Sequence, residues 1–366
     1  MWLVGSVVTL TGLGLVMVYS ASISFAQVTL GNSTYYLWHQ AAGVCLGLFF
    51  IYVVKHTPVR LWQAAGPYLL LGGMALLVLV LLPGIGVNVN GSSRWLRLGV
   101  VNIQPSEFVK LAIVIYVAGY YVRKQDELHN FTQGVVIISL VVAAVGTLLL
   151  LEPDLGAAIV ICVTVLGMLF LAGVRFWHFS VVTAAGIGGM LLLTFVSPYR
   201  LQRLVAFLDP WADPFNSGFQ LVQALIAFGR GEWFGVGLGA SVQKLYYLPA
   251  AHTDFLFAVT AEELGLVGVL VIIVLFGVLI ARAFVIAKQA ETVGLIYAAR
   301  LAQGVGLLLG SQAIINMGVN MGVLPTKGLT LPFMSYGGSN LLMSLFAVGL
   351  LLMVERETRN HAWGVH

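Results

Sequence analysis

Long apolar stretches separated by short polar segments recur along the whole of this 366-residue chain. Each stretch holds about 18–25 residues, the length that an α-helix needs to cross a bilayer. A membrane β-barrel would show short segments of alternating polarity instead. The pattern predicts an all-α, polytopic membrane protein that forms a single integral-membrane domain over residues 1–366. Its ten predicted spans are 2–21, 37–55, 60–82, 106–122, 132–151, 156–174, 177–196, 255–284, 296–320 and 336–354.

The positive residues of the short connections predict the orientation of these spans. Lys and Arg follow the even-numbered spans, whereas segments 22–36 and 152–155 contain neither. Positive residues in short loops mark the cytoplasmic side. We therefore expect both termini in the cytoplasm, with a short tail over 355–366. The first stretch lacks the basic start of a signal peptide and is interpreted as a retained span, with no cytoplasmic tail before it.

One connection, residues 197–254, is far longer than the others. It carries Arg200, Arg203, Arg230 and Lys244 together with many Trp, Phe and Tyr residues. Aromatic rings of this kind suit the membrane–water interface, and long loops do not follow the charge rule. We expect an outer loop that contains short helices lying flat on the membrane.

Composition makes the few acidic residues informative, because 60% of the residues are hydrophobic and only 9% are charged. Asp254 stands at the start of a long apolar helix, where an ionisable group is expensive to desolvate. It could cap that helix, since Asp is a favoured cap. It could also act as a general base, and the two roles are compatible. The net charge of +4 is spread over loops and does not indicate nucleic acid. Cys45 and Cys162 lie in apolar stretches and are interpreted as small buried residues, not as a disulfide or metal pair.

Two polar segments precede and open the fourth span. Gly91-Ser-Ser-Arg-Trp95 and the residues up to Gly99 form an outer loop that contains Arg94 and Arg97. Gln104-Pro-Ser-Glu107 begins the helix, where Glu107 and Lys110 are i,i+3 neighbours that can pair. The segments suit either a structural ion pair with interfacial anchors or a site for an anionic headgroup, because Arg binds phosphate oxygens with two donors.

Further polar groups have a structural and a functional interpretation. Glu152-Pro-Asp-Leu-Gly156 is best interpreted as a capped turn. Gln312, Asn316 and Asn320 share one helical face, which suits hydrogen bonds between helices or the wall of a polar cavity. The glycines of 229–231 and 235–239 resemble phosphate loops only weakly, because no βαβ unit surrounds them. No zinc-type ligand spacing or Ser-His-Asp signature is present in the sequence.

These motifs, in this order, resemble the SEDS family (shape, elongation, division and sporulation) over nearly the whole chain. The resemblance rests on the segments already quoted and on Tyr199-Arg200, Asp209-Pro-Trp-Ala-Asp-Pro-Phe215, Ala227-Phe-Gly-Arg-Gly-Glu232, Val242-Gln-Lys-Leu245, Ala251-His-Thr-Asp-Phe255, Glu262-Glu-Leu-Gly265, Leu324-Pro-Thr-Lys-Gly-Leu-Thr-Leu-Pro332 and Ser335-Tyr-Gly-Gly-Ser339. Thr326-Lys327 is more similar to the division branch of the family than to the elongation branch. Ala250 and Asn340 depart from the usual Glu and Ser.

The resemblance implies a peptidoglycan glycosyltransferase with the SEDS fold, which polymerises lipid II into glycan strands at the division septum of the cytoplasmic (inner) membrane. It implies that Asp254 is the catalytic acid–base residue and deprotonates the acceptor sugar. We expect substrate contacts from Arg94, Glu107, Lys110, Arg200, Arg203, Lys244, His252, Lys327 and Ser335. The metal ligands are unknown; no tightly bound cofactor is expected, and Mg²⁺ on the pyrophosphate is a candidate ion.

The implied partners are lipid II, the undecaprenyl-pyrophosphate-linked glycan, the lipid bilayer and an FtsI-like class B penicillin-binding protein, with divisome proteins of the FtsQ–FtsL–FtsB and FtsN types. No nucleic acid is expected. Two alternatives remain at the level of the sequence: a lipid II flippase and a scaffold for division proteins without catalytic activity. A flippase needs a polar path across the bilayer, whereas the spans at 156–174 and 177–196 are almost wholly apolar.

Overall fold

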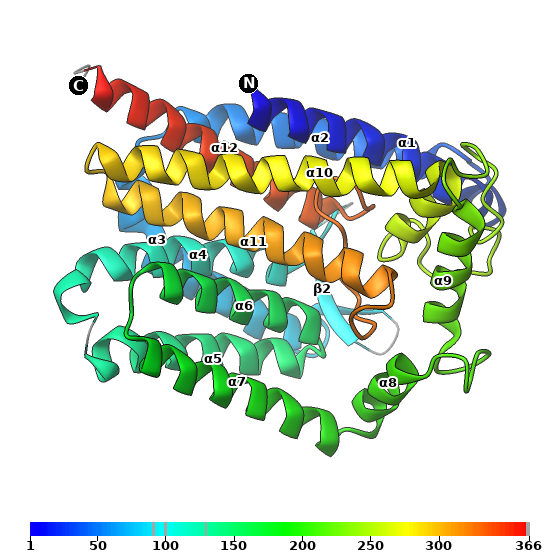
Figure 1. Ribbon diagram of the computed structural model, residues 1–366, viewed down its shortest axis with the longest axis horizontal. Helices are drawn as coiled ribbons and strands as arrows, with labels where there is room; N and C mark the ends of the chain where they lie inside the picture. Colours follow the sequence, from blue (N-terminus) through cyan, green and yellow to red (C-terminus); the bar gives the residue numbers. More distant parts are fainter. Residues whose placement is uncertain (90–91, 99–100, 129, 364–366) are drawn as a thin grey trace. The chain divides into compact units, whose positions relative to one another are not determined.

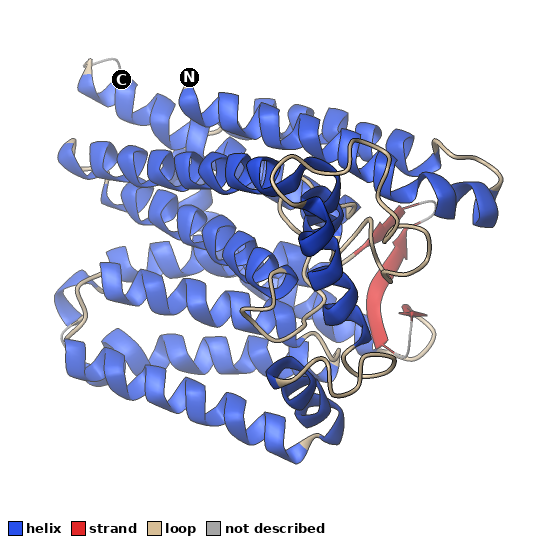
Figure 2. Ribbon diagram, turned by 45° about the vertical axis from the view of Figure 1, so that its right-hand side comes forward, coloured by secondary structure: helices blue, strands red, loops and turns tan. Residues whose placement is uncertain are grey.

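A computed structural model describes residues 1–89, 92–98, 101–128 and 130–363. Helices form nearly all of the regular structure, and Figure 2 shows the few strands in red. The helices, in the order of the colours of Figure 1, are α1 (Trp2–Leu30), α2 (Tyr35–Lys55), α3 (Val59–Leu81), α4 (Pro105–Arg123), α5 (Ile137–Leu151), α6 (Leu155–Leu171), α7 (Phe176–Val196), α8 (Pro198–Leu208), α9 (Phe219–Gly231), α10 (Leu256–Thr292), α11 (Ile296–Asn320) and α12 (Gly338–Ala362). A 3₁₀ turn (Gln125–Glu127) and a π-helical turn (Thr132–Val136) precede α5.

The all-α membrane fold predicted from the apolar pattern is confirmed. Within the described residues, nine helices are long and apolar enough to cross a membrane, and α6, at 17 residues, is a shorter apolar helix. The prediction of ten spans stays a prediction for this reason. Some helices are longer than predicted: α1 continues to Leu30, α10 to Thr292, and α12 runs through most of the predicted tail to Ala362. Both cysteines are free, but Cys45 is exposed on α2, so its predicted burial is wrong.

The described residues form two compact units. Unit 1 comprises Met1–Cys45, Gly188–Leu279 and Gln312–Leu341, and unit 2 comprises Leu46–Ile187, Ile280–Ser311 and the residues from Leu342 onward. The long predicted loop belongs to unit 1 and contains two helices, α8 and α9, as expected from its sequence.

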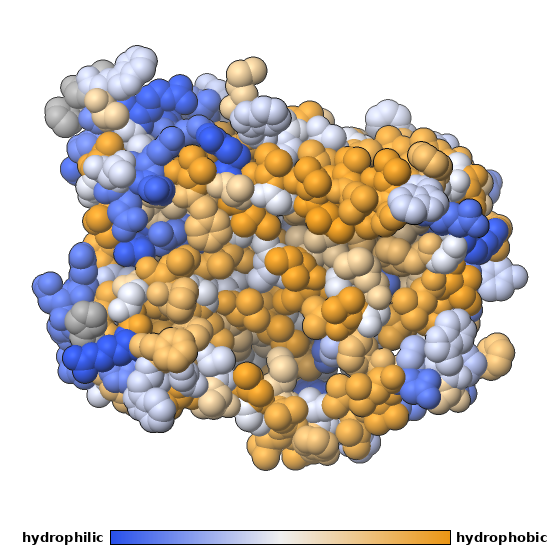
Figure 3. Space-filling view, viewed as in Figure 1, coloured by the Kyte–Doolittle hydropathy of each residue, from blue (hydrophilic) through white to orange (hydrophobic). Residues whose placement is uncertain are grey.

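Unit 1 holds α1 closely against the loop that precedes α12. A Cβ added at Gly14 of α1 would lie 2.6 Å from the Cα of Met334, so this contact requires glycine. The Gln40 amide donates to the carbonyl of Ser335 at 3.1 Å. Apolar side chains cover much of α10 in Figure 3. Leu270 and Val274 of this helix are 50% and 60% exposed, as suits a lipid-facing helix.

Helix α10 is interrupted at Gly265, whose backbone (φ 66°, ψ −166°) is not helical. The loop after α9 replaces the missing helical hydrogen bonds. Leu266 N–H donates to the Glu232 carbonyl at 2.9 Å, and the Glu262 carbonyl accepts from Val236 N–H at 2.9 Å. Irregular backbone in a membrane protein is stable when other backbone groups satisfy it in this way.

The glycine-rich segment 235–239 provides that replacement, which explains its composition. Gly235, Gly237 and Gly239 all have positive φ values, of 80°, 103° and 82°. A Cβ at Gly265 would lie 2.3 Å from the Gly235 nitrogen. These glycines therefore allow two backbone segments to pair closely, and their resemblance to a phosphate loop has a structural explanation.

Unit 2 is built around α4, a largely buried helix: 83% of its apolar segment lies inside the protein. Gly73 of α3 faces Val109 of α4, where an added Cβ would lie 2.8 Å from a methyl group. The connection between these helices forms a small antiparallel sheet that the sequence did not predict. Its strands are β1 (Gly86–Val89), β2 (Ser92–Leu98) and β3 (Val101–Ile103), in the order β1-β2-β3. Trp95 pairs with Val87, and Leu96 pairs with Ile103.

Candidate active site

Asp254 lies in the turn that leads into α10 in unit 1, and its residue is half-buried. Its carboxylate is close to the loop between α11 and α12. A Cβ added at Gly328 would lie 3.2 Å from Asp254 Oδ2. Because Gly328 has no side chain, this loop can approach the carboxylate closely. Lys327 is the residue before Gly328 in the chain.

The polar face of α11 holds both segments in place. The side-chain amide of Asn316 donates to the carbonyl of Asp254 at 2.9 Å and also to the carbonyl of Leu329. Asn320 donates to the same Asp254 carbonyl at 3.0 Å. Gln312, one turn earlier, donates to the Thr330 carbonyl at 3.1 Å. The shared face predicted from the sequence therefore fixes the turn that carries Asp254 relative to the loop that carries Lys327.

The start of α10 receives a cap from α11. The N–H of Ala258 donates to Asn320 Oδ1 at 3.1 Å, and the first helical bonds are accepted by the carbonyl of Phe255. Asp254 thus precedes the residue at which the helix begins. The N–H of Ala258 is therefore capped by Asn320 and not by Asp254.

Positive side chains surround the loop beside Asp254. Arg203 of α8 donates to the carbonyl of Thr326 at 3.4 Å. Burial, followed by the charges of Arg203 and Arg200, lowers the pKa of Lys327 to about 8. Arg200, on the same helix, donates to the Leu193 carbonyl at 3.2 Å. We name Lys327, Arg203 and Arg200 the basic group; it can bind an anion such as a pyrophosphate, which would also relieve the repulsion among its charges.

His252 lies two residues before Asp254 within a group of aromatic rings. Its ring centroid is 4.7 Å from that of Tyr36, 5.5 Å from that of Phe25 and 5.9 Å from that of Tyr336. Burial lowers the pKa of His252 to about 4, so the imidazole is neutral at physiological pH. The Tyr336 N–H donates to the His252 carbonyl at 2.9 Å. The histidine is therefore an uncharged ring within an aromatic group, two residues before Asp254 in the chain.

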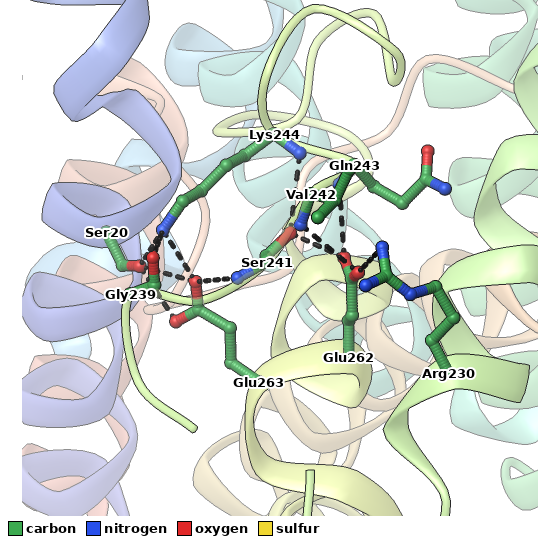
Figure 4. Close-up of polar contacts among 9 residues, drawn as sticks. All are labelled: Ser20, Arg230, Gly239, Ser241, Val242, Gln243, Lys244, Glu262 and Glu263. Carbon is green, nitrogen blue, oxygen red and sulfur yellow. Dashed lines mark hydrogen bonds and ion pairs between the residues drawn. The ribbon is translucent and has the colours of Figure 1, made fainter. Parts of the chain in front are cut away.

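Two other predicted substrate contacts in unit 1 have structural partners. Ser335 is buried; its hydroxyl accepts the N–H of Leu331 at 2.9 Å and so closes the turn before α12. Lys244 is also buried, and Figure 4 shows its ammonium between the Glu263 carboxylate (2.8 Å), the Ser20 hydroxyl (3.0 Å) and the Gly239 carbonyl (2.7 Å). These contacts occupy the donors of Lys244.

The neighbouring Glu262 completes this buried polar network. Its carboxylate forms an ion pair with Arg230 at 3.0 Å, and it accepts the backbone N–H groups of Val242 and Gln243 (Figure 4). The network joins α1, α9, α10 and the loop over 239–244. It has the geometry of a structural anchor.

The remaining predicted site residues belong to unit 2. Glu107 and Lys110 form the predicted i,i+3 ion pair at 2.9 Å, and both are buried. Arg94 lies on β2 and donates to the carbonyls of Glu152 (3.0 Å) and Pro153. Arg94 therefore holds the turn between α5 and α6. Gly91 and Gly99 of the same motif lie outside the described residues.

That turn contains a capping residue and an unpaired acid. Asp154 accepts the N–H of Ala157 at 3.1 Å, which confirms the predicted cap of α6, and it also accepts the Ser106 hydroxyl at 3.0 Å. Both carboxylate oxygens of Glu152 are buried, and no side chain or backbone group in the described ranges donates a hydrogen bond to them. Burial and the charge of Asp154 raise the pKa of Glu152 to about 8, against the lowering effect of Arg94.

The residues around Asp254 do not form a metal site by themselves. No group of three or more His, Cys, Asp or Glu side chains able to hold a metal ion occurs within the described ranges of the chain. The basic group repels a cation, and hard cations such as Mg²⁺ require several oxygen ligands. This donor set does not fit a protein-held Mg²⁺ ion, and no step of the mechanism below uses one.

Sequence reasoning missed three contributors to the site. Gly328 is needed for the close approach to Asp254, and Phe25 and Tyr36 face His252 from α1 and α2. Gly328 belongs to the motif Leu324–Pro332, so the sequence alone could have indicated it as a site residue. Nothing in the local sequence connects the two aromatic residues with His252, because they are more than two hundred positions away in the chain.

Known proteins resemble this chain along its length. The profile of the cell cycle proteins FtsW, RodA and SpoVE matches residues 1–360. A protein of Nitrosococcus halophilus named "Probable peptidoglycan glycosyltransferase FtsW" is 55% identical over 359 residues, which cover 98% of this chain and 92% of that protein. A protein of Coxiella burnetii with the same name is 51% identical over 359 residues, which cover 98% and 96%.

Solved structures show the same fold. One solved structure is described as "Structural coordination of polymerization and crosslinking by a peptidoglycan synthase complex". A chain of this structure superposes on the present chain with a TM-score of 0.79 at 30% identity, over 97% of both chains. The rod shape determining protein RodA of Thermus thermophilus superposes with a TM-score of 0.70 at 28% identity, over 97% of this chain and 96% of that one. From the full-length profile match, the high identity to relatives of nearly equal length and the shared fold, it follows that the chain belongs to the FtsW/RodA/SpoVE family of cell cycle proteins.

Proposed function

We propose that this protein is a peptidoglycan glycosyltransferase that polymerises lipid II, with Asp254 as the general base. The observation that carries the proposal is the position of the Asp254 carboxylate: it is half-buried and close to the backbone of Gly328, the residue that follows Lys327 of the basic group. A base and an anion-binding group side by side suit a reaction in which a hydroxyl attacks and a pyrophosphate leaves.

In the proposed reaction, Asp254 takes the proton from the 4-hydroxyl of the acceptor sugar. The oxygen forms a bond to the anomeric carbon of the donor glycan, and the bond from that carbon to the pyrophosphate oxygen breaks. Undecaprenyl pyrophosphate leaves with the electron pair, and the configuration at the anomeric carbon inverts. The proton on Asp254 then passes to solvent.

The basic group stabilises the leaving pyrophosphate. Its charges lie on a loop and a helix that are joined by the Arg203–Thr326 hydrogen bond, so they can act together on one anion. Fixed positive groups stabilise charge that develops in the transition state at little reorganisation cost. The neutral ring of His252 provides a surface for a sugar or its substituent, while Asn316 and Asn320 position Asp254.

The decisive experiment uses purified full-length protein and Asp254→Asn with lipid II in detergent, together with the class B penicillin-binding protein expected as partner. Asn keeps the size of the side chain but cannot accept the proton. We expect glycan polymerisation to fall by about 10²- to 10⁴-fold, while lipid II binding and thermal stability stay close to those of the wild type. Activity within a few-fold of wild type would exclude Asp254 as the base.

The same assay separates the polymerase from a flippase or a scaffold. Detergent removes the membrane, so polymer formation in it requires catalysis rather than transbilayer movement. Transport of lipid II in sealed vesicles, with no polymer under any condition that includes the partner, would favour the flippase. Neither transport nor polymer, with normal partner binding, would favour the scaffold.

The proposed setting is the division septum, with both termini in the cytoplasm and Asp254 on the outer face of the membrane. The membrane-crossing helices support an integral membrane location. The resemblance to a chain of a peptidoglycan synthase complex supports a partner that crosslinks the glycan. Cysteine labelling tests the orientation: residue 230 should react from outside and residue 359 only from inside, and the reverse pattern would overturn the location of the site.

A further inference from the structure

Unit 2 contains a second charged region that the proposed reaction does not use. A cavity of about 810 Å³ lies where the end of α2, the start of α3, the start of α11 and the end of α12 meet. Its wall includes Lys55, Arg60, Gln63, Arg356 and Asn360. The orientation predicted from the sequence places all of these helix ends on the cytoplasmic side, away from Asp254.

The positive charges of this wall are largely not neutralised by the protein. Within the part of the chain that the structure describes, neither Lys55 nor Arg60 forms an ion pair, and Arg356 donates to the carbonyl of Lys55 at 2.9 Å. One acidic residue, Glu357, also lines the cavity, but its carboxylate accepts the N–H of Val59 at 3.0 Å and so stabilises the start of α3. The cavity therefore has an excess of positive charge.

A buried hydroxyl in the same wall lacks a partner. Tyr297, at the start of α11, is 5% exposed, and its hydroxyl has no hydrogen-bond partner among the residues that the structure describes. A buried polar group without a hydrogen bond costs free energy, which an oxygen-rich ligand in the cavity can recover. This observation is independent of the charges and indicates a bound group with acceptor oxygens.

The cavity continues along α3 toward the apolar surface of that helix. A second hollow of about 590 Å³ shares Arg60 and Gln63 with the first, contains Arg123 and ends at Tyr68. The side chains of Leu61, Tyr68 and Leu71 along α3 are 51%, 77% and 65% exposed, in a helix apolar enough to cross a membrane. A ligand that fills both hollows has an anionic end among the cations and an apolar end against α3.

We propose that this region binds an anionic phospholipid. The phosphodiester lies among Lys55, Arg60 and Arg356, with Tyr297 as a further donor, and an acyl chain follows α3 past Tyr68. Positive residues in short loops also determine membrane orientation, but that role requires no shared cavity. Basic pockets between membrane helices bind anionic headgroups, and each well-placed cation contributes measurably to binding.

The test uses the full-length protein in neutral-lipid nanodiscs. Binding of a fluorescent phosphatidylglycerol is measured by titration, with phosphatidylcholine as the neutral competitor and inorganic phosphate as the soluble anion. We expect saturable binding that phosphatidylglycerol, but neither phosphatidylcholine nor millimolar phosphate, displaces. Equal displacement by phosphate would show a site for soluble anions, and non-saturable binding would show only a diffuse attraction; both results would overturn the proposal.

Variants locate the site. Arg60→Gln with Arg356→Gln should weaken phosphatidylglycerol binding by roughly tenfold or more. Arg359→Gln is the matched control, because Arg359 is an exposed residue of the same helix, α12, and does not line the cavity. Tyr297→Phe removes one hydroxyl, keeps the packing and should weaken phosphatidylglycerol binding by a few-fold. This single variant still tests the site if the double variant does not fold. An equal loss in Arg359→Gln, or unchanged binding in both other variants, would overturn the assignment.

Discussion

Lys244 and Lys327 belong to the same unit and to motifs that look equally functional in the sequence, but their surroundings differ. Lys244 is buried, and Glu263, Ser20 and Gly239 occupy its ammonium (Figure 4). Lys327 is half-buried in a loop among other cations; its burial, followed by the charges of these cations, lowers its pKa to about 8. A cation that already has an anionic partner contributes to the fold, whereas a cation among like charges gains by binding an anion.

The two acids of these regions differ in burial. Glu263 is fully buried and pairs with Lys244, while Asp254 is half-buried and faces the Gly328 backbone. Removing one partner of a buried pair leaves an uncompensated charge, so such pairs are sensitive to substitution. The comparison therefore predicts that similar substitutions in the two regions have opposite consequences for stability and activity.

The largest expected contrast is between Asp254→Asn and Glu263→Gln, which both replace a carboxylate by an amide. The former should lower polymerisation by about 10²- to 10⁴-fold with an unchanged melting temperature. The latter leaves the buried Lys244 ammonium without its anion and should cost about 3–5 kcal/mol of stability. Thermal unfolding in detergent, together with the yield of folded protein, measures the difference. A Glu263→Gln variant as stable as the wild type would show that the buried network is not an anchor.

A smaller effect is expected from the amide that positions Asp254. Asn320→Leu removes the cap on Ala258 and one hydrogen bond to the Asp254 carbonyl. We expect a loss of about 1 kcal/mol of stability, as for other helix caps, and a roughly tenfold loss of kcat. Ser311→Ala on the same helix, α11, is the control, since its hydroxyl bonds to Thr164 and Leu308 in unit 2. Equal kinetic losses in both variants would indicate a general disturbance of α11.

The pH dependence of substrate use should distinguish Lys327 from a residue with a fixed charge. Because the pKa of Lys327 is lowered to about 8, its positive charge is complete well below pH 8 and is lost as the pH rises through that value. KM for lipid II should therefore rise between pH 7 and 9. Lys327→Arg keeps its charge over this range and should remove most of that rise. An identical pH profile for wild type and Lys327→Arg would exclude this lysine as a substrate contact.

The last expected effect is on stability alone and concerns Glu152, a buried acid whose carboxylate no described residue hydrogen-bonds. Its pKa in the folded protein, about 8, lies above the ordinary value of 4.5, so the folded state keeps a proton that the unfolded state loses. Stability is therefore greatest below pH 4.5 and decreases as the pH rises toward 8. Glu152→Gln should be less sensitive to pH, which melting temperatures at pH 6 and 9 will show. A parallel decrease in both proteins would assign the pH dependence to other groups.

The sequence was sufficient for the fold and for part of the site. The length of the apolar stretches predicts membrane-spanning helices. The bilayer offers no hydrogen-bond partners, so the backbone N–H and C=O groups must bond to one another within a helix. The i,i+4 spacing of Asn316 and Asn320 predicted a shared face, but not that this face holds Asp254. The assignment of Asp254 and Lys327 to a reaction came from the family resemblance, and the geometry around them supports it.

The sequence could not reveal which cations are already paired. Lys244 and Ser20 are 224 positions apart, so no local pattern indicates their contact. For Arg94 the sequence left a structural and an anion-binding role open, and it could not show that this arginine donates to carbonyls 58 and 59 positions away. The small sheet was missed because its strands are short and one contains an irregular register between Val87 and Asn88. In each case the deciding partner is distant in the chain.

The break at Gly265 has a mechanical consequence for Asp254. A continuous helix transmits a tilt through its i→i−4 hydrogen bonds, but here Leu266 and Val267 bond to Glu232 and Trp233 instead. The short helix that follows Asp254 is therefore coupled to the loop after α9 more directly than to the long membrane-crossing part of α10. A force on this loop therefore acts on the turn that carries Asp254 more directly than on the long part of α10 that follows Gly265.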